Sequence, residues 1–367
     1  MKKILITIIL AFTFLLTGCG GCASCNGAPI LSYGNGWLGD QAPIAGFKEE
    51  LTYDVKLDKN LIVGDTNFKS NVSKSVLDCD AVGTYKVTTE IILANDVDLG
   101  EYTSNVLNNV LNNPDTNADK TVIKITTELN LDFSYKYGSV DKTNNDKIIT
   151  KTYLLGSDSA FAPIYSETSS LQTRVSANKT VAVQQQHIQT ISVYNNTKVN
   201  TVINFIKEGV EAKSTYTKEE ILKTEKKSTE YTYKSAIDNT SLLFATRSVV
   251  IGSDTVTMPV YTPSYDKVQN INMAKASSMK EKFTIGANAE EELSIVAFSL
   301  SLNTTSGCTT GKNTGRSQLV FLNAVKNPAP ASLGSNRTLV MKYVEPLIEY
   351  GGYNSIGALV YKLNNIA

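Results

Sequence analysis

The side chains that most often carry catalytic chemistry are sparse in this sequence. His187 is the single histidine among 367 residues, which excludes the His-Glu-x-x-His zinc proteases and any site built from several histidines. A Ser-His-Asp triad would have to use His187, but the sequence contains no Gly-x-Ser-x-Gly nucleophile elbow. Because glutamines surround His187, we expect it to face solvent on a strand rather than to catalyse a reaction.

Two other chemistries are suggested by composition and spacing. Residues 307–313 look like a phosphate-binding loop, but their glycines are one residue too close, and Asn313 stands where Mg²⁺ needs Ser or Thr. A hairpin tip is therefore expected. The 35 Asp and Glu residues leave a carboxylate pair for glycoside hydrolysis open, although aromatic residues, which stack on sugars, make up only 8%. The formal net charge of zero argues against a nucleic-acid partner, since binding to phosphates needs a basic face, and none is expected.

The N-terminus carries a targeting signal. Lys2 and Lys3 precede an apolar stretch, residues 4–16, that is too short to span a bilayer and suits the core of a signal peptide. The Leu-Thr-Gly-Cys sequence that ends at Cys19 resembles the bacterial lipobox, in which the peptidase cuts before a cysteine that receives acyl chains such as palmitate. The resemblance implies a lipoprotein signal peptide at residues 1–18. Acylated Cys19 would then anchor the protein to the extracytoplasmic face of the cell membrane or outer membrane.

Four further cysteines are Cys22, Cys25, Cys79 and Cys308. Cys22 and Cys25 have the spacing of redox motifs, but they lie in a Gly-rich segment rather than between a strand and a helix. A zinc site would need a second close pair, and Cys79 and Cys308 are far apart in the sequence. Two alternatives remain open: disulfides joining Cys22 to Cys25 and Cys79 to Cys308, or free thiols in an anaerobic host. No metal or other cofactor is expected.

The elements that must position these residues are mostly strands. From Phe47 onward apolar and polar residues alternate, most clearly over residues 121–137, which predicts a long strand with one buried face that bends or breaks once. Such strands are typical of antiparallel sheets that face solvent on one side. Further strands are predicted at residues 50–57, 84–93, 148–155, 188–195, 229–237, 248–251, 255–261, 293–302, 317–323, 338–344 and 356–363.

Helix signals are few. Residues 104–113 have apolar side chains at helical spacing before Pro114. Residues 217–220 have the spacing of a capping box, and Asp238 is placed to cap a short turn. Turns are predicted at residues 141–146, 195–196, 252–254, 311–315 and 351–352. The pattern therefore predicts a mainly β chain with two or three short helices.

Several segments resemble, in the same order, a bacterial family of secreted proteins of unknown function. The segments are an opening strand at residues 47–55, a middle strand at 161–167, a short helix at 238–247, and closing strands at 336–340 and 350–359. The resemblance implies a strongly curved antiparallel sheet or incomplete β-barrel. Carriers of the lipoprotein-localisation type have a similar architecture and hold acyl chains on the concave face. The family has no agreed activity, so it assigns no functional residue.

Together these features predict a signal peptide at residues 1–18, a flexible tether at 19–46 and a single large β-rich domain, or two sub-domains, at 47–367. We expect a non-enzymatic cell-envelope lipoprotein that binds an apolar ligand or an envelope component on its curved sheet. One alternative is a surface lipoprotein that makes only protein contacts; these two differ in whether the concave face is empty and apolar. The other is a hydrolase of envelope glycans, which needs two carboxylates about 5–10 Å apart.

Overall fold

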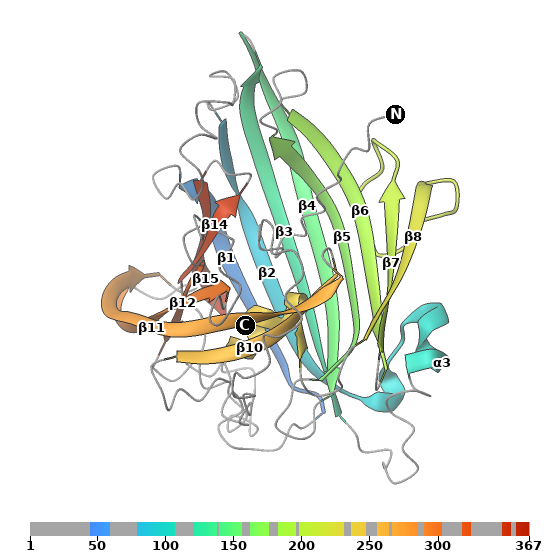
Figure 1. The fold of residues 1–367 in the computed structure, drawn as a ribbon. Helices are drawn as coiled ribbons and strands as arrows, with labels where there is room; N and C mark the ends of the chain where they lie inside the picture. The colour runs from blue at the N-terminus through green and yellow to red at the C-terminus, as the bar shows by residue number, and fades with distance from the viewer. Residues whose placement is uncertain are drawn as a thin grey trace, which may run out of the picture.

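The chain folds into one long, rolled β-sheet (Figure 1). The computed structural model describes residues 45–58, 79–106, 121–137, 139–155, 162–175, 183–195, 198–230, 236–246, 255–263, 266–284, 290–302, 318–323, 347–353 and 357–366. Its strands are β1 (Lys48–Asp58), β2 (Cys79–Leu93), β3 (Thr121–Tyr137), β4 (Val140–Leu155), β5 (Pro163–Val175), β6 (Val183–Tyr194), β7 (Lys198–Ile206), β8 (Ile221–Glu230), β9 (Ile237–Asp238), β10 (Thr255–Thr262), β11 (Lys267–Phe283), β12 (Glu291–Leu302), β13 (Gln318–Asn323), β14 (Leu347–Tyr353) and β15 (Gly357–Ile366). The described helical segments are short: η2 (Ala94–Asp96), η3 (Gly100–Tyr102), α3 (Thr103–Val106), η5 (Asn239–Ser241) and α4 (Leu242–Thr246).

The sheet has 15 strands in the spatial order β8-β7-β6-β5-β4-β3-β2-β1-β15-β14-β13-β12-β11-β10-β9. Neighbouring strands run antiparallel, except that β9 pairs with β10 in parallel. Because β8 and β9 lie at opposite ends of this order, the sheet is not closed by a ladder between its ends. The predicted mainly β fold, one large curved antiparallel sheet with few helices, is confirmed.

Side-chain alternation gives the sheet an inner and an outer face. We call the face that carries Ile125 and Leu129, with the side chains in register with them, the inner face. A core covers it at β1, β2, β3 and β15, and Leu243 of α4 packs against that core. Each large apolar side chain buried there stabilises the fold by about 1.5–3 kcal/mol. The core consists of Leu51, Tyr53, Val55, Leu57, Cys79, Ala81, Tyr85, Leu129, Leu131, Phe133, Ile148, Leu359, Tyr361 and Leu363.

The outer face is covered at one end by the segment from η2 to α3. Val97 and Val106 of this segment pack with Val122 of β3 and with Tyr153 and Tyr165 of β4 and β5. Polar residues elsewhere on the outer face form ion pairs between adjacent strands, such as Lys124 Nζ with Glu90 Oε2 at 2.8 Å. Only part of the outer face is therefore hidden from water.

Gly83 marks a place where two strands approach each other too closely for a side chain. A Cβ atom at Gly83 in β2 would lie 1.9 Å from the backbone oxygen of Asn130 in β3. Glycine is thus required at this point of the β2–β3 ladder.

Most predicted strands are confirmed. Those predicted at residues 50–57, 84–93, 121–137, 148–155, 188–195, 255–261, 293–302, 317–323 and 356–363 fall within or overlap β1, β2, β3, β4, β6, β10, β12, β13 and β15. β3 runs without a break from Thr121 to Tyr137. The strands predicted at 248–251 and 338–344 lie outside the described residues, as does the part of the 104–113 helix that follows α3.

Other predictions are wrong, and in each case tertiary pairing outweighs a local signal. Residues 141–146 form no turn, because they extend β4 alongside the end of β3. Residues 351–352 lie inside β14, where the register with β15 shifts. Residues 217–220 form a turn before strand β8 instead of a helix. Of the strand predicted at 229–237, the first two residues end β8 and the last begins β9, and residues 231–235 lie outside the described residues. β7 and β11 are not predicted, and β5 and β14 are predicted only where the family resemblance places a strand.

Candidate functional site

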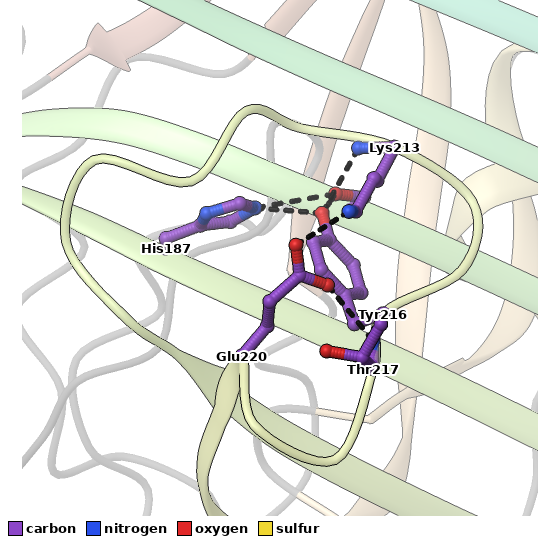
Figure 2. A network of polar contacts seen from close by, with 6 residues as sticks. His187, Lys213, Tyr216, Thr217 and Glu220 are labelled. Carbon is purple, nitrogen blue, oxygen red and sulfur yellow. Dashed lines mark hydrogen bonds and ion pairs between the residues drawn. The ribbon is translucent and has the colours of Figure 1, made fainter.

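His187 lies in β6 beneath a loop formed by residues 207–220, which folds over the outer face of β5, β6 and β7 (Figure 2). The side chain is 6% exposed, so the expectation that it faces solvent is wrong. Its Nε2 atom lies 2.7 Å from the hydroxyl oxygen of Tyr216 in the loop. The two rings meet edge to face, with centroids 5.2 Å apart. Of the glutamines around His187, Gln189 contacts this loop, whereas Gln184 is exposed, so only part of this Gln-rich segment faces water.

The Tyr216 hydroxyl joins the loop to the sheet. It makes a hydrogen bond with Ser169 Oγ of β5, and it accepts one from the Lys213 backbone amide at 3.0 Å. Burial raises the pKa of Tyr216, so the hydroxyl stays protonated at physiological pH. Gln189 holds the same loop, because its Nε2 donates to the backbone oxygen of Ser214 at 2.9 Å. The loop is thus fixed by hydrogen bonds to two neighbouring strands.

Glu220 closes the loop where β8 begins. Its carboxylate accepts from Lys213 Nζ at 2.6 Å and from the Thr217 amide at 2.8 Å. The Lys213 hydrogen bond is the main reason that the pKa of Glu220 is lowered. The capping-box spacing predicted here is therefore used, but in a turn that leads into a strand. The backbone amide of Lys207 donates to the Glu220 carbonyl at 2.9 Å, and this bond lies next to the start of the pairing between β7 and β8.

Glu167 of β5 lies on the same face as His187 and is connected to it indirectly. Its two carboxylate oxygens accept from Gln189 Nε2 at 3.0 Å and from the Tyr165 hydroxyl at 3.3 Å. Asn204 of β7 donates to Gln189 Oε1 at 2.9 Å and so extends the network across three strands. Burial raises the pKa of Glu167, against the opposing influence of Lys151 and these hydrogen bonds.

The geometry at His187 does not form a nucleophile. Ser169 Oγ lies 3.5 Å from His187 Nε2, which is too long for a strong hydrogen bond, and it is bonded to Tyr216 instead. Burial lowers the pKa of His187 to about 4, with Lys213 adding to this effect while Glu220 and a backbone hydrogen bond with Val210 oppose it. The neutral imidazole instead makes a hydrogen bond with the Tyr216 hydroxyl, which helps to hold the loop against the sheet. Among the described residues, the Glu167 carboxylate is hydrogen-bonded to Tyr165 and Gln189 and not to the imidazole.

A second polar cluster lies on the inner face and centres on Asp238 at the far end of the sheet. The carboxylate is fully buried and accepts hydrogen bonds from Ser166 Oγ at 2.8 Å and from the Tyr194 hydroxyl. It also accepts from the Thr240 amide at 2.8 Å, which confirms the predicted cap. In Figure 1, β10 and β11 cross in front of the central strands. The contact between the Tyr261 hydroxyl and Thr201 Oγ1, at 3.0 Å, places β10 against β7.

Of the cysteines predicted to be functional, Cys79 alone lies among the described residues. Cys79 is buried in β2 within the inner core. Cys19, Cys22, Cys25 and Cys308 lie outside the described residues, so lipidation and both disulfides stay predictions. Within the described ranges, no three His, Cys, Asp or Glu side chains gather in a set that could hold a metal ion.

The sequence did contain one signal for the buried clusters. Residues 188–194 of β6 carry apolar side chains on both faces, including Ile188, Ile191 and Tyr194. Burial on both faces means that something covers each side of the strand. In the structure the inner side is covered near Asp238, and the outer side under the loop and the η2–α3 segment.

Comparisons with known proteins add the following. No known family model matches the chain, and no curated protein matches it. A solved structure, a beta-barrel-like protein of domain of unknown function DUF1849 from Brucella abortus, is similar with a TM-score of 0.42 and 8% identity, over 88% of this chain and 98% of that one. So distant a likeness assigns no role to any residue. Among the helices in the described part of the chain, none is long and apolar enough to cross a membrane.

Proposed function

We propose that this protein is a lipid-anchored, extracytoplasmic protein that works by binding another envelope protein and not by catalysis. The anchor would be Cys19, on the strength of the lipobox-like sequence and the apolar stretch before it. The observation that carries the proposed mode of action is that the inner face is occupied by the chain's own segments. Leu243 packs on its apolar half, and Asp238 is hydrogen-bonded on its hydroxyl-rich half.

An acyl-chain carrier needs an apolar concave face that is free to receive its ligand. Here β4, β5 and β6 present Thr150, Thr168 and Thr190 to the inside, and all three are buried. The Thr150 hydroxyl is satisfied by Thr127, but the Thr190 hydroxyl has no partner among the described residues, and an acyl chain would offer it none, which is costly. This lining supports contact with polar protein groups over carriage of a lipid.

Catalysis receives little support from the two polar clusters. The Ser169 hydroxyl and the His187 imidazole are both hydrogen-bonded to the Tyr216 hydroxyl. The Glu167 carboxylate accepts hydrogen bonds from Tyr165 and Gln189. A general acid or nucleophile in either position would have to give up contacts that fasten a loop or a strand. The proposal is therefore of a binding protein.

Two measurements test the proposal. First, the Cys19→Ser variant should move from the membrane to the soluble fraction and should lose incorporation of labelled palmitate, while Cys22→Ser should behave like the unmodified chain. Retention of Cys19→Ser on the membrane would refute the anchor.

Second, native mass spectrometry of residues 26–367, purified without detergent from an envelope compartment, should show the mass of the polypeptide alone. A bound mass of several hundred daltons that fragments as a lipid would refute the proposed mode of action and favour a protein that carries acyl chains. The two results are independent, because the anchor and the occupied inner face lie in different parts of the chain.

A further inference from the structure

The hydroxyl-rich part of the inner face is an ordered array. Thr152, Ser166, Ser192 and Thr201 lie side by side on β4, β5, β6 and β7, because each is in register with the next. All four are at most 3% exposed. A permanently closed sheet would be expected to bury apolar side chains in such a row. We call these four residues the hydroxyl row.

The segment Ile237–Ser241 is laid across the hydroxyl row. Asp238 accepts from Ser166 Oγ at 2.8 Å, and Thr240 Oγ1 lies 2.6 Å from Thr152 Oγ1. The Tyr194 hydroxyl donates a hydrogen bond to the same carboxylate oxygen of Asp238 as the Ser166 hydroxyl does. The polar part of the contact thus depends mainly on one carboxylate presented by a short extended stretch, and its side-chain partners are hydroxyl donors. The same stretch also buries Ile237, which pairs with Val260 of β10.

This contact contains an unfavourable element. The side-chain amide of Asn239 is 1% exposed, yet neither its nitrogen nor its oxygen has a hydrogen-bond partner in the part of the chain that the structure describes. Thr190, two residues before Ser192 and on the same face, is 4% exposed, and its hydroxyl also lacks a partner among the described residues. Buried polar groups without partners are rare and costly, because they lose hydrogen bonds to water. Both groups would regain partners if the segment lifted or were replaced.

A polar contact of this kind opens more easily than an apolar core. Water can take over the hydrogen bonds of hydroxyl and carboxylate groups, whereas exposing apolar side chains carries the full hydrophobic penalty. The inner core of β1, β2, β3 and β15 is apolar and stays closed. The two halves of the inner face therefore differ in how readily they can be uncovered.

We propose that the hydroxyl row is a recognition site for an extended segment that carries a carboxylate, and that Ile237–Ser241 occupies it in the closed molecule as an intramolecular latch. The inference rests on the proposed binding function and names the chemistry of the partner. A partner segment would place an Asp or Glu side chain between Ser166 and Tyr194, in the position that Asp238 takes.

Hydrogen exchange on the full chain tests the latch. In the unmodified protein, the amides of residues 237–246 and 255–262 should exchange faster than those of β1, β2 and β15. Asp238→Ala should speed exchange in the same two ranges about tenfold to 100-fold, since hydrogen bonds to a charged group are lost. Exchange in β1, β2 and β15 should stay the same. Asp132→Ala, at an exposed position of β3, serves as the matched control and should change neither set.

A peptide with the sequence of residues 236–244 tests recognition in trans. Labelled with a fluorophore, it should bind the Asp238→Ala chain saturably, and a peptide with Asn in place of the aspartate should bind at least about tenfold more weakly, for the same loss of charge. The unmodified chain should bind the peptide less than the variant does, because its own latch competes. Equal binding of the two peptides, or no binding, would overturn the proposed site.

Global destabilisation is distinguishable from opening of the latch. If Asp238→Ala speeds exchange in all strands alike, Ser166→Ala, which removes a single donor, is measured in the same way. Uniform loss of protection in both variants would overturn the latch and assign Asp238 a purely structural role. Failure of peptide binding leaves the palmitate and native mass results unchanged, so the proposed function stands or falls separately.

Discussion

Acidification is expected to destabilise this protein through His187. Burial lowers the pKa of His187 to about 4 in the folded chain, whereas an exposed histidine in the unfolded chain titrates near pH ~6.5. Below that pH the unfolded chain takes up a proton that the folded chain does not accept until the pH approaches 4. The free energy of unfolding therefore falls as the pH drops through this window. Above the window the imidazole is neutral in both states and contributes nothing.

The size of the effect follows from the environment of the ring. A shift of this size would correspond to about 3 kcal/mol if none of it were relieved by water. The groups that face His187 are Tyr216, Lys213 and Glu220, and the Lys213 side chain is 43% exposed. Because water reaches part of the cluster, we expect a loss of about 1–2 kcal/mol between about pH 7 and about pH 5.

Urea unfolding at these two pH values measures the loss, and the variant His187→Gln isolates its cause. The unmodified chain should lose stability on acidification, and the variant should lose less by about 1–2 kcal/mol, since glutamine does not titrate. An equal loss in both proteins would refute the reasoning, because it would show that other groups carry the pH dependence.

Three further predictions concern single contacts. Tyr216→Phe removes the hydroxyl that Ser169 and His187 share, so it should cost about 1–3 kcal/mol in urea unfolding and speed hydrogen exchange in residues 207–220; Tyr135→Phe is the control, and equal costs would contradict the role of the hydroxyl. Gly83→Ala forces β2 away from Asn130 and should lower stability by about 1–3 kcal/mol; an unchanged urea midpoint would show that the strands separate freely. If Cys79 and Cys308 form a disulfide, reduction should raise the mass by about 2 Da for that bond, and Cys308→Ser should abolish the change; an unchanged mass on reduction would indicate thiols.

Fold class could be predicted from sequence because alternation is a local property. β3 shows this best, since its odd positions are apolar except for Thr121 and Thr127, and the strand runs as predicted from Thr121 to Tyr137. Long-range pairing could not be predicted in the same way. Residues 141–146 have the composition of a turn, yet they extend β4 because the end of β3 offers them hydrogen-bond partners.

The polar clusters were harder to predict than the strands. His187 is surrounded by glutamines, and nothing in the local sequence shows that Tyr216 folds back over it. For Asp238 the sequence predicted the cap but not the partners, since Ser166 and Tyr194 are contributed by strands distant in sequence. Burial of a polar residue depends on what covers it, and the covering segment is chosen by tertiary structure.

The exposed end of the sheet at β8 has a consequence for how copies of the protein behave when crowded. A free edge strand invites a second copy to pair with it, and continued pairing builds fibrils. Two registers pair the most residues of two β8 strands related by a twofold axis. One brings Glu225 opposite itself and Lys223 opposite Lys227, and like charges directly opposite each other oppose this register. The other brings Lys226 opposite itself but Glu225 opposite Lys227, so its charges oppose pairing less. The charges of β8 therefore select against one of the two ways in which copies could join edge to edge.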